Sequence, residues 1–133
     1  MLSITSNPKN IREVESYLRS LDFELRFNEN KYADILISLT EAVNNAIIHG
    51  NQNDESKQVH ISAREVTEGI SFRVEDEGSG FNPVKVPDPT CTQNIETCGG
   101  RGVYIMKALA DKITFCDNGR CVEMFFHLHK QPI

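Results

Sequence analysis

Apolar side chains recur at intervals of three and four between residues 32 and 47, which predicts an amphipathic helix packed against a core. Asn28 or Asn30 can cap the start of this helix, which is predicted to run to about His49. The positions that form the apolar stripe are Tyr32, Ile35, Leu36, Leu39, Ala42, Val43, Ala46 and Ile47.

One flank of this predicted helix is polar. Glu41, Asn45 and His49 are each four residues apart, so their side chains line up along the helix, and Gly50 ends it. A carboxylate, an amide and an imidazole stacked beside a core stripe are unusual for a purely structural helix. The alternative is an ordinary polar flank that faces water.

Two other helices and a short strand are predicted from the same kind of pattern. Leu2–Thr5 is predicted as an edge strand, Ser6-Asn7-Pro8 opens a helix that runs to about Leu21, and Gly99–Gly102 opens another. The apolar positions of these two helices are Ile11, Val14, Tyr17, Leu18 and Leu21, and Val103, Met106, Leu109 and Ala110.

Alternating apolar and polar residues predict two strands joined by a turn at Glu68-Gly69. Asp76 lies two positions beyond Val74 of the second strand, so its carboxylate points to the same buried side. A buried carboxylate without a partner is costly, so Asp76 needs a donor from the protein or from a ligand. The inward-facing positions are Val59, Ile61 and Ala63, and Ile70, Phe72 and Val74.

The last third of the chain is predicted to form a hairpin, because Asn118-Gly119 between apolar runs is typical of a type I′ turn. A two-residue turn places Cys116 opposite Cys121 at a position where side chains come close. Two reduced thiols are expected for this pair in a cytoplasmic protein, and a redox-sensitive disulfide is the alternative. The other predicted pairs are Asp117 with Arg120, Phe115 with Val122, and Ile113 with Met124.

These elements predict an α+β fold, a two-layer α/β sandwich in which three helices lie on one face of a mostly antiparallel sheet. The 133 residues suit a single domain spanning 1–133. Residues 82–98 contain three prolines and no clear periodicity, so we expect a mobile loop that acts as a lid.

Composition narrows the function classes. The net charge is −5 and the chain has no basic run, which argues against a nucleic-acid surface and against an anionic membrane. No apolar stretch is long enough to span a bilayer, and the first residues lack the pattern of a signal peptide. We therefore expect a cytoplasmic protein whose four cysteines are mostly reduced.

Three segments carry candidate chemistry. Asp76-Glu77-Gly78-Ser79-Gly80 leaves the end of a strand, where glycines let a ligand approach the backbone closely. Gly99–Gly102 opens a helix, and backbone N–H groups there suit phosphates. Asn45 offers an amide oxygen to Mg²⁺, and Glu41, one turn away, can orient an attacking hydroxyl or water. Together these parts predict a nucleotide site for phosphoryl transfer.

The order of these motifs resembles a known superfamily. E-x-x-x-N at Glu41, D-x-G-x-G at Asp76 and G-G-R-G-V at Gly99 are similar to the GHKL (Bergerat-fold) ATP-binding proteins. Within that superfamily, the segment TEAVNNAIIHGN is most similar to the bacterial anti-sigma factor serine kinases. The resemblance implies a sandwich that holds ATP between its helices and its sheet.

The resemblance also implies residue roles. Glu41 would be the general base, Asn45 would help hold Mg²⁺, and Asp76 would bind the adenine amino group. His49 would lie near the phosphates. The remaining implied contacts are Gly78 and Gly80 beside the base and sugar, and Gly100, Arg101, Gly102 and Val103 with the phosphates under the lid.

This chain departs from the family pattern in two places. Many members carry a threonine near the adenine in the last hairpin, where this chain has Gly119-Arg120-Cys121-Val122, so the resemblance does not extend to that contact. Cys91 and Cys98 in the predicted lid are also unexpected.

By resemblance, the protein would phosphorylate a serine on a small antagonist protein, sequester a sigma factor in another state, and form a homodimer. Phe125, on the outer face of the predicted sheet, is consistent with a dimer surface, although scattered apolar residues are normal there. Alternatives are ATP hydrolysis and an ATP-gated binding module. A sensor histidine kinase is disfavoured, because a dimerisation helix pair would have to precede the ATP domain. A zinc site from the cysteines and histidines has poor spacing.

Overall fold

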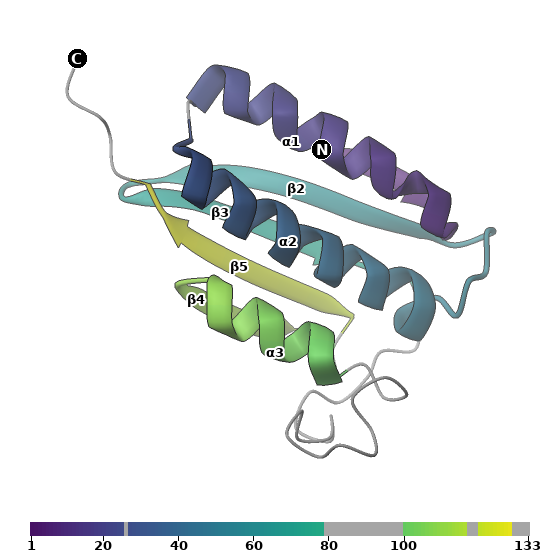
Figure 1. Cartoon of the computed structure of the whole chain (residues 1–133). Coiled ribbons are helices and arrows are strands. Elements are labelled where there is room, and N and C mark those ends of the chain that lie inside the picture. The colour runs from purple at the N-terminus through teal and green to yellow at the C-terminus, as the bar shows by residue number, and fades with distance from the viewer. Residues whose placement is uncertain (26, 79–99, 117–119, 129–133) are drawn as a thin grey trace.

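The computed structural model describes residues 1–25, 27–78, 100–116 and 120–128, and there it forms two layers (Figure 1). One layer is an antiparallel five-stranded sheet and the other consists of helices α1, α2 and α3, which all cover the same face of that sheet. The predicted α+β sandwich is confirmed. The elements are β1 Leu2–Thr5, α1 Ile11–Leu25, α2 Glu29–Asn45, β2 Gln58–Val66, β3 Gly69–Glu75, α3 Gly100–Leu109, β4 Lys112–Cys116 and β5 Cys121–His127.

The sheet has the strand order β1-β2-β3-β5-β4, so β1 lies at one edge as predicted and β4 at the other. β3 is paired on both sides, and this fixes the point at which the chain leaves the strand at Asp76. Within the described residues, no helix is long and apolar enough to cross a membrane.

The predicted hairpin register is confirmed where it is described. Ile113 pairs with Met124, Phe115 with Val122, and Cys116 with Cys121. The remaining predicted parts, namely the pair that Asp117 makes with Arg120 and the turn at Asn118-Gly119, lie outside the described residues.

The turn between β2 and β3 differs from the prediction by one residue. Val66 pairs with Gly69, so the turn consists of Thr67 and Glu68 and not of Glu68-Gly69. Gly69 belongs to the strand because β5 approaches it closely: a Cβ at this position would overlap the backbone carbonyl of Phe126. The glycine therefore serves strand packing and not the turn.

The core lies between the helices and the sheet. Most of the apolar stripe of α2 and the turn that follows it is buried in this core, as the sequence pattern predicts, whereas Tyr32 and Leu36 are only partly buried. Phe72 and Phe126 meet edge to face with ring centroids 6.1 Å apart, a favourable aromatic geometry. The residues with no exposed surface include Val14, Leu18, Ile35, Leu39, Val43, Ile47, Val59, Ile61, Phe72, Met124 and Phe126.

The starts of the first two helical segments follow capping rules. Asn7 accepts a hydrogen bond from the N–H of Lys9 and opens a short 3-10 turn, Pro8–Asn10, before α1. Of the two candidate caps for α2, Asn28 is the one used, because its side chain accepts from the N–H of Lys31 at 2.7 Å. α1 extends to Leu25, four residues beyond the predicted end.

The end of α2 is a correction. The α-helix stops at Asn45 and continues as one π-helical turn, Ala46–Gly50, where a continuous α-helix to His49 was predicted. The N–H of Asn51 donates to the carbonyl of Ala46 at 2.8 Å, so this hydrogen bond spans five residues. The four-residue spacing of the polar flank therefore ends at Asn45.

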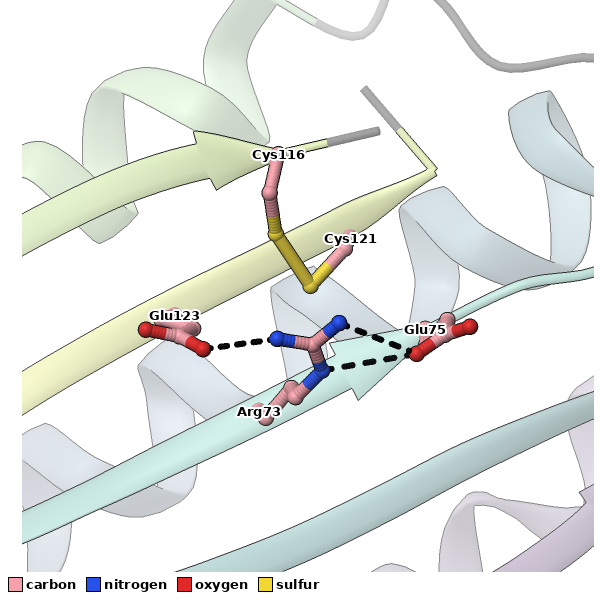
Figure 2. The surroundings of a disulfide bond; sticks show 5 residues. All are labelled: Arg73, Glu75, Cys116, Cys121 and Glu123. Atoms are coloured by element: carbon pink, nitrogen blue, oxygen red, sulfur yellow. Dashed lines mark hydrogen bonds and ion pairs between the residues drawn. A yellow bond between two sulfur atoms is a disulfide. The ribbon is translucent and has the colours of Figure 1, made fainter. Parts of the chain in front are cut away.

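The cysteine expectation is also corrected. Cys116 and Cys121 are joined by a disulfide across β4 and β5 (Figure 2). Reduced thiols were expected for this pair, so that expectation is wrong and the disulfide alternative is the one observed. Cys91 and Cys98 lie outside the described residues.

Asn51 connects three segments near the end of β3. It is 1% exposed, and its amide donates to the Ser6 hydroxyl at 2.8 Å and to the Gln58 carbonyl at 3.1 Å. Its side-chain oxygen accepts from the N–H of Glu77 at 2.9 Å. This single side chain therefore holds the residues after β3 against the start of β2.

We expect Asn51→Ala to lower the free energy of unfolding by about 2–3 kcal/mol, because it leaves buried polar groups without partners. Urea unfolding measures the change. Asn44→Ala is the matched control, since Asn44 makes no side-chain hydrogen bond within the described part of the chain and alanine favours the helix. Equal stability of the two variants would contradict the role given to Asn51.

Candidate active site

Asp76 sits directly after β3 with only 5% of its surface exposed, as the alternation predicts. Its Oδ1 accepts a hydrogen bond from the N–H of Gly78 at 2.8 Å. Its own N–H donates to the carbonyl of Arg120 at 2.8 Å. The described residues provide no donor to Oδ2, so this oxygen is available to a ligand.

The surroundings of Asp76 change its acidity. Burial raises the pKa of the Asp76 carboxyl, because the charged form loses its water. The N–H of Gly78 and the charge of Arg120 act in the opposite direction on that pKa and only reduce the shift. The carboxylate is therefore held in an environment that favours a hydrogen-bond donor as its partner.

Two glycines make room for this carboxylate. A Cβ at Gly50 would overlap the Asp76 carboxylate, and a Cβ at Gly78 would overlap the carbonyl oxygen of Gly50. Gly78 was predicted to lie beside the base and sugar of a nucleotide, and this packing against Gly50 was not anticipated. The role of Gly50 was missed, because the sequence pattern identified it only as the end of a helix. Gly80 lies outside the described residues.

A pocket opens between α2, α3 and strands β3, β5 and β4. It contains about 260 Å³ of empty space, including its mouth, and Asp76 lies in its wall. Arg120 and Phe115 of the hairpin contribute to the wall, which the sequence analysis did not anticipate. The described residues that line it are Ala42, Asn45, Ala46, Val74, Asp76, Met106, Phe115, Arg120 and Val122.

The polar flank of α2 meets the first turn of α3 at Gly102. A Cβ on Gly102 would lie 3.0 Å from the Glu41 Oε2 and 3.2 Å from the Asn45 Nδ2, closer than side chains normally approach. The Nδ2 of Asn45 is buried and has no hydrogen-bond partner among the described residues. The absence of a side chain at Gly102 therefore brings a helix N-terminus against a carboxylate and an unsatisfied amide.

The other predicted site residues do not line the pocket within the described part of the chain. Gly100, Arg101, Gly102 and Val103 form the first turn of α3, and the side chain of Val103 is buried in the core. His49 is exposed and lies in the π-helical turn, outside the pocket lining, so the structure does not bring it to Asp76. In the described ranges, no group of three or more His, Cys, Asp or Glu side chains could hold a metal ion, which gives no support to the zinc alternative.

Comparison with known proteins identifies the family. The model of the histidine kinase-like ATPase domain matches residues 4–126. The chain belongs to this family. Its resemblance to the GHKL superfamily is therefore confirmed, and the pocket between α2, α3 and the sheet is the candidate nucleotide site of a kinase-like ATPase domain.

Relatives within the family carry two kinds of name. An anti-sigma F factor of Clostridium perfringens is 35% identical over 102 residues, which cover 75% of this chain and 70% of the relative. An anti-sigma F factor of Anoxybacillus flavithermus is 32% identical over 125 residues, covering 88% and 81% of the two chains. The serine-protein kinase RsbW of Bacillus licheniformis is 25% identical over 138 residues, covering 96% and 84%.

A solved structure supports the fold. The histidine kinase domain of a blue-light activated histidine kinase from Erythrobacter litoralis aligns with a TM-score of 0.52 at 20% identity. The alignment covers 74% of this chain and 45% of that chain. At this identity the likeness concerns the fold alone.

We expect Gly102→Ala to weaken binding of Mg-ADP by about tenfold or more, because the new methyl group must displace Glu41 or Asn45. Thermal unfolding should show little loss of stability, since alanine favours a helix over glycine. Calorimetric titration measures the affinity. Lys107→Ala, an exposed substitution on the same helix, is the control, and equal weakening in both variants would contradict the role of Gly102.

We expect Asp76→Asn to raise the free energy of unfolding at neutral pH, because a buried amide lacks the penalty of a buried charge. Since folding raises the pKa of Asp76, that penalty is absent below the usual pKa of an aspartate and develops as the pH rises through the raised pKa. Urea unfolding between about pH 3 and about pH 7 should therefore show a gain that appears only at the upper end.

Asp54→Asn is the matched control for this prediction, because it should change the free energy of unfolding in the opposite direction. Hydrogen bonds from the Ser56 hydroxyl and N–H lower the pKa of Asp54, so its charged form stabilises the fold above the usual pKa of an aspartate. This variant should lose stability at neutral pH. A loss of stability in Asp76→Asn at neutral pH would contradict the assignment of Asp76 as a carboxylate disfavoured by burial.

Proposed function

We propose that this protein is an ATP-dependent serine-protein kinase that phosphorylates a small antagonist protein and, in another state, sequesters a sigma factor in the cytoplasm. The names of its relatives, anti-sigma F factor and serine-protein kinase RsbW, support this proposal. The observation that carries it is the close approach of Gly102 to Glu41 and Asn45, which places an anion-binding helix end beside a carboxylate.

The two ends of the pocket suit the two ends of ATP. Asp76 would offer Oδ2 as an acceptor for the amino group of adenine, and Gly50 and Gly78 leave room for this carboxylate. The first turn of α3, residues 100–103, has backbone N–H groups without intrahelical partners, which suit phosphate oxygens. Residues 82–98, which the sequence predicts as a lid, lie outside the described residues.

Asn45 is the residue that fits a magnesium ion. Its amide is buried and unsatisfied among the described residues, and a flip of the side chain presents either its oxygen or its nitrogen to the site. When bound with ATP, Mg²⁺ would neutralise charge that develops on the phosphates. Asn45 would supply one oxygen ligand, in keeping with the oxygen preference of this ion.

Glu41 would act as the general base. It lies one helical turn before Asn45 and next to the first turn of α3, so a serine hydroxyl that approaches the phosphates would meet its carboxylate. Glu41 would accept the hydroxyl proton as the serine oxygen attacks the terminal phosphate. Arg101 and His49 would contact phosphates or the partner protein.

Glu41→Gln is expected to lower transfer of labelled phosphate by about 100-fold or more while nucleotide binding is retained. The assay mixes the full chain with γ-labelled Mg-ATP and a soluble lysate, and follows the label by gel and mass spectrometry. Label on one small protein, lost with Glu41→Gln, supports the kinase. Glu13→Gln, an exposed change on α1, is the control and should keep full activity.

The other outcomes of this assay identify the alternatives. Label released only as inorganic phosphate would replace the kinase with an ATP hydrolase. Bound ATP without transfer or release would leave an ATP-gated binding module. Failure to bind ATP would contradict the nucleotide site itself.

We also propose that the protein is a homodimer. The face of the sheet opposite the helices is left uncovered by the described elements, and the half-buried Phe125 lies there beside His127 with ring centroids 4.8 Å apart. Light scattering at micromolar concentration should give twice the chain mass of 15.0 kDa. A monomer under these conditions would contradict this part of the proposal.

A further inference from the structure

The Cys116–Cys121 disulfide is directly next to the wall of the nucleotide pocket. Phe115 precedes Cys116 in β4, Arg120 comes directly before β5, and Val122 follows Cys121 in β5. These three neighbours all line the pocket. Because successive residues of a strand point to opposite faces, the cysteines face away from the pocket while Phe115 and Val122 face it.

The disulfide also holds an edge strand of the sheet. β4 is an edge strand, so its backbone is paired with β5 alone. Cys116 and Cys121 form the last pair of this ladder, and Phe115 and Val122 form the pair before it. The covalent bond therefore fixes the spacing of Phe115 and Val122 at the end of the hairpin where the chain passes from β4 to β5.

The same hairpin end is connected to Asp76. The carbonyl of Arg120, the residue before Cys121, accepts the backbone N–H of Asp76 at 2.8 Å. The charge of Arg120 also acts on the Asp76 carboxyl. A shift of this end of the hairpin would thus move both the wall of the pocket and the Asp76 carboxylate, which is proposed to bind adenine.

We propose that Cys116 and Cys121 form a thiol–disulfide switch that sets the affinity of the pocket for nucleotide, with the disulfide as the tight-binding state. This inference rests on the proposed function, since it takes the pocket to bind ATP. Reduction would remove the covalent restraint between β4 and β5 at this end, so that Phe115 of the edge strand would no longer be held at a fixed distance from Val122, which β3 keeps in place.

The reductant can reach the disulfide without entering the pocket. Figure 2 shows the disulfide beside Arg73, which is held between Glu75 and Glu123, on the face of the sheet that the described helices do not cover. Cys121 is 1% exposed and Cys116 is only half-buried, so an incoming thiolate meets the sulfur of Cys116 first. Nucleotide and reductant therefore act from opposite sides of the sheet.

The redox chemistry needs two equivalents of a thiol, such as glutathione. A thiolate attacks the Sγ of Cys116, the bond between the two cysteine sulfurs breaks, and the electron pair leaves on Cys121 as a thiolate that takes up a proton. A second thiolate attacks the sulfur of the glutathione in the mixed disulfide and releases Cys116. The products are two protein thiols and one molecule of glutathione disulfide.

The first test compares one protein in two redox states. Cys91→Ser/Cys98→Ser removes the other two cysteines, so that any response belongs to Cys116 and Cys121. Calorimetric titration with Mg-ADP should show at least about fivefold weaker binding after reduction than in the disulfide form. The mass of alkylated protein establishes which form is present.

Equal affinities for Mg-ADP in the two states would overturn the switch and leave the proposed function intact. No binding in either state would overturn both. Adding Cys116→Ser to the same background should give the weaker affinity with or without reductant. Circular dichroism checks its fold, and if this variant does not fold, the comparison of the two redox states still decides.

The second test uses thermodynamic reciprocity. If the disulfide tightens nucleotide binding, saturating Mg-ADP must make the disulfide harder to reduce by the same factor. Equilibration of the Cys91→Ser/Cys98→Ser protein in glutathione buffers, with and without Mg-ADP, should shift the ratio of thiol to disulfide by about fivefold or more. An unchanged ratio would overturn the coupling independently of the affinity measurement.

Discussion

The burial of one carboxylate is the constraint around which this site is built. Asp76 is 5% exposed, and a charge in such a place is stable only if its surroundings are shaped for it. Gly50 and Gly78 supply space, the N–H of Gly78 supplies a donor, and the Arg120 carbonyl holds the backbone. The hydrogen bond from Gly78 is local, but the contacts of Gly50 and Arg120 with Asp76 come from distant segments, so the environment of Asp76 depends on the tertiary fold.

A second close approach completes the site at its other end. α2 and α3 lie on the same face of the sheet, and the absence of a side chain at Gly102 leaves room there for the side chains of Glu41 and Asn45. Both helices offer groups that the helices themselves do not satisfy, namely the first N–H groups of α3 and the Asn45 amide. The packing of α2 against α3 therefore brings together polar groups that have no hydrogen-bond partner within their own helix.

Much of this arrangement follows from periodicity. The alternation along β3 predicts that Asp76 lies on the buried side of the sheet. The turn expected at Asn118-Gly119 predicts which residues of β4 and β5 are paired. Both predictions depend on the two-residue repeat of a strand. The order of helices and strands follows for the same reason. These features depend on patterns that are local in the sequence, so one amino-acid sequence is enough to predict them.

The features that sequence patterns missed depend on contacts between distant segments. Gly50 is a spacer for Asp76, and Gly69 is a strand residue pressed against Phe126, yet both look like helix or turn glycines. Arg120 joins the pocket because of where β5 meets the end of β3. The sequence showed that Cys116 and Cys121 face each other, whereas composition alone suggested that they would be reduced.

Because of the π-helical turn Ala46–Gly50, the geometry of this site depends on the exact number of residues in that turn. Its five-residue hydrogen bond absorbs one residue more than an α-helical turn would, and the chain then delivers Gly50 to Asp76 and Asn51 to Glu77. Removal of one residue would restore a regular helix and rotate everything after it by about 100°. Homologous chains can therefore exchange side chains in this turn more readily than they can gain or lose a residue there.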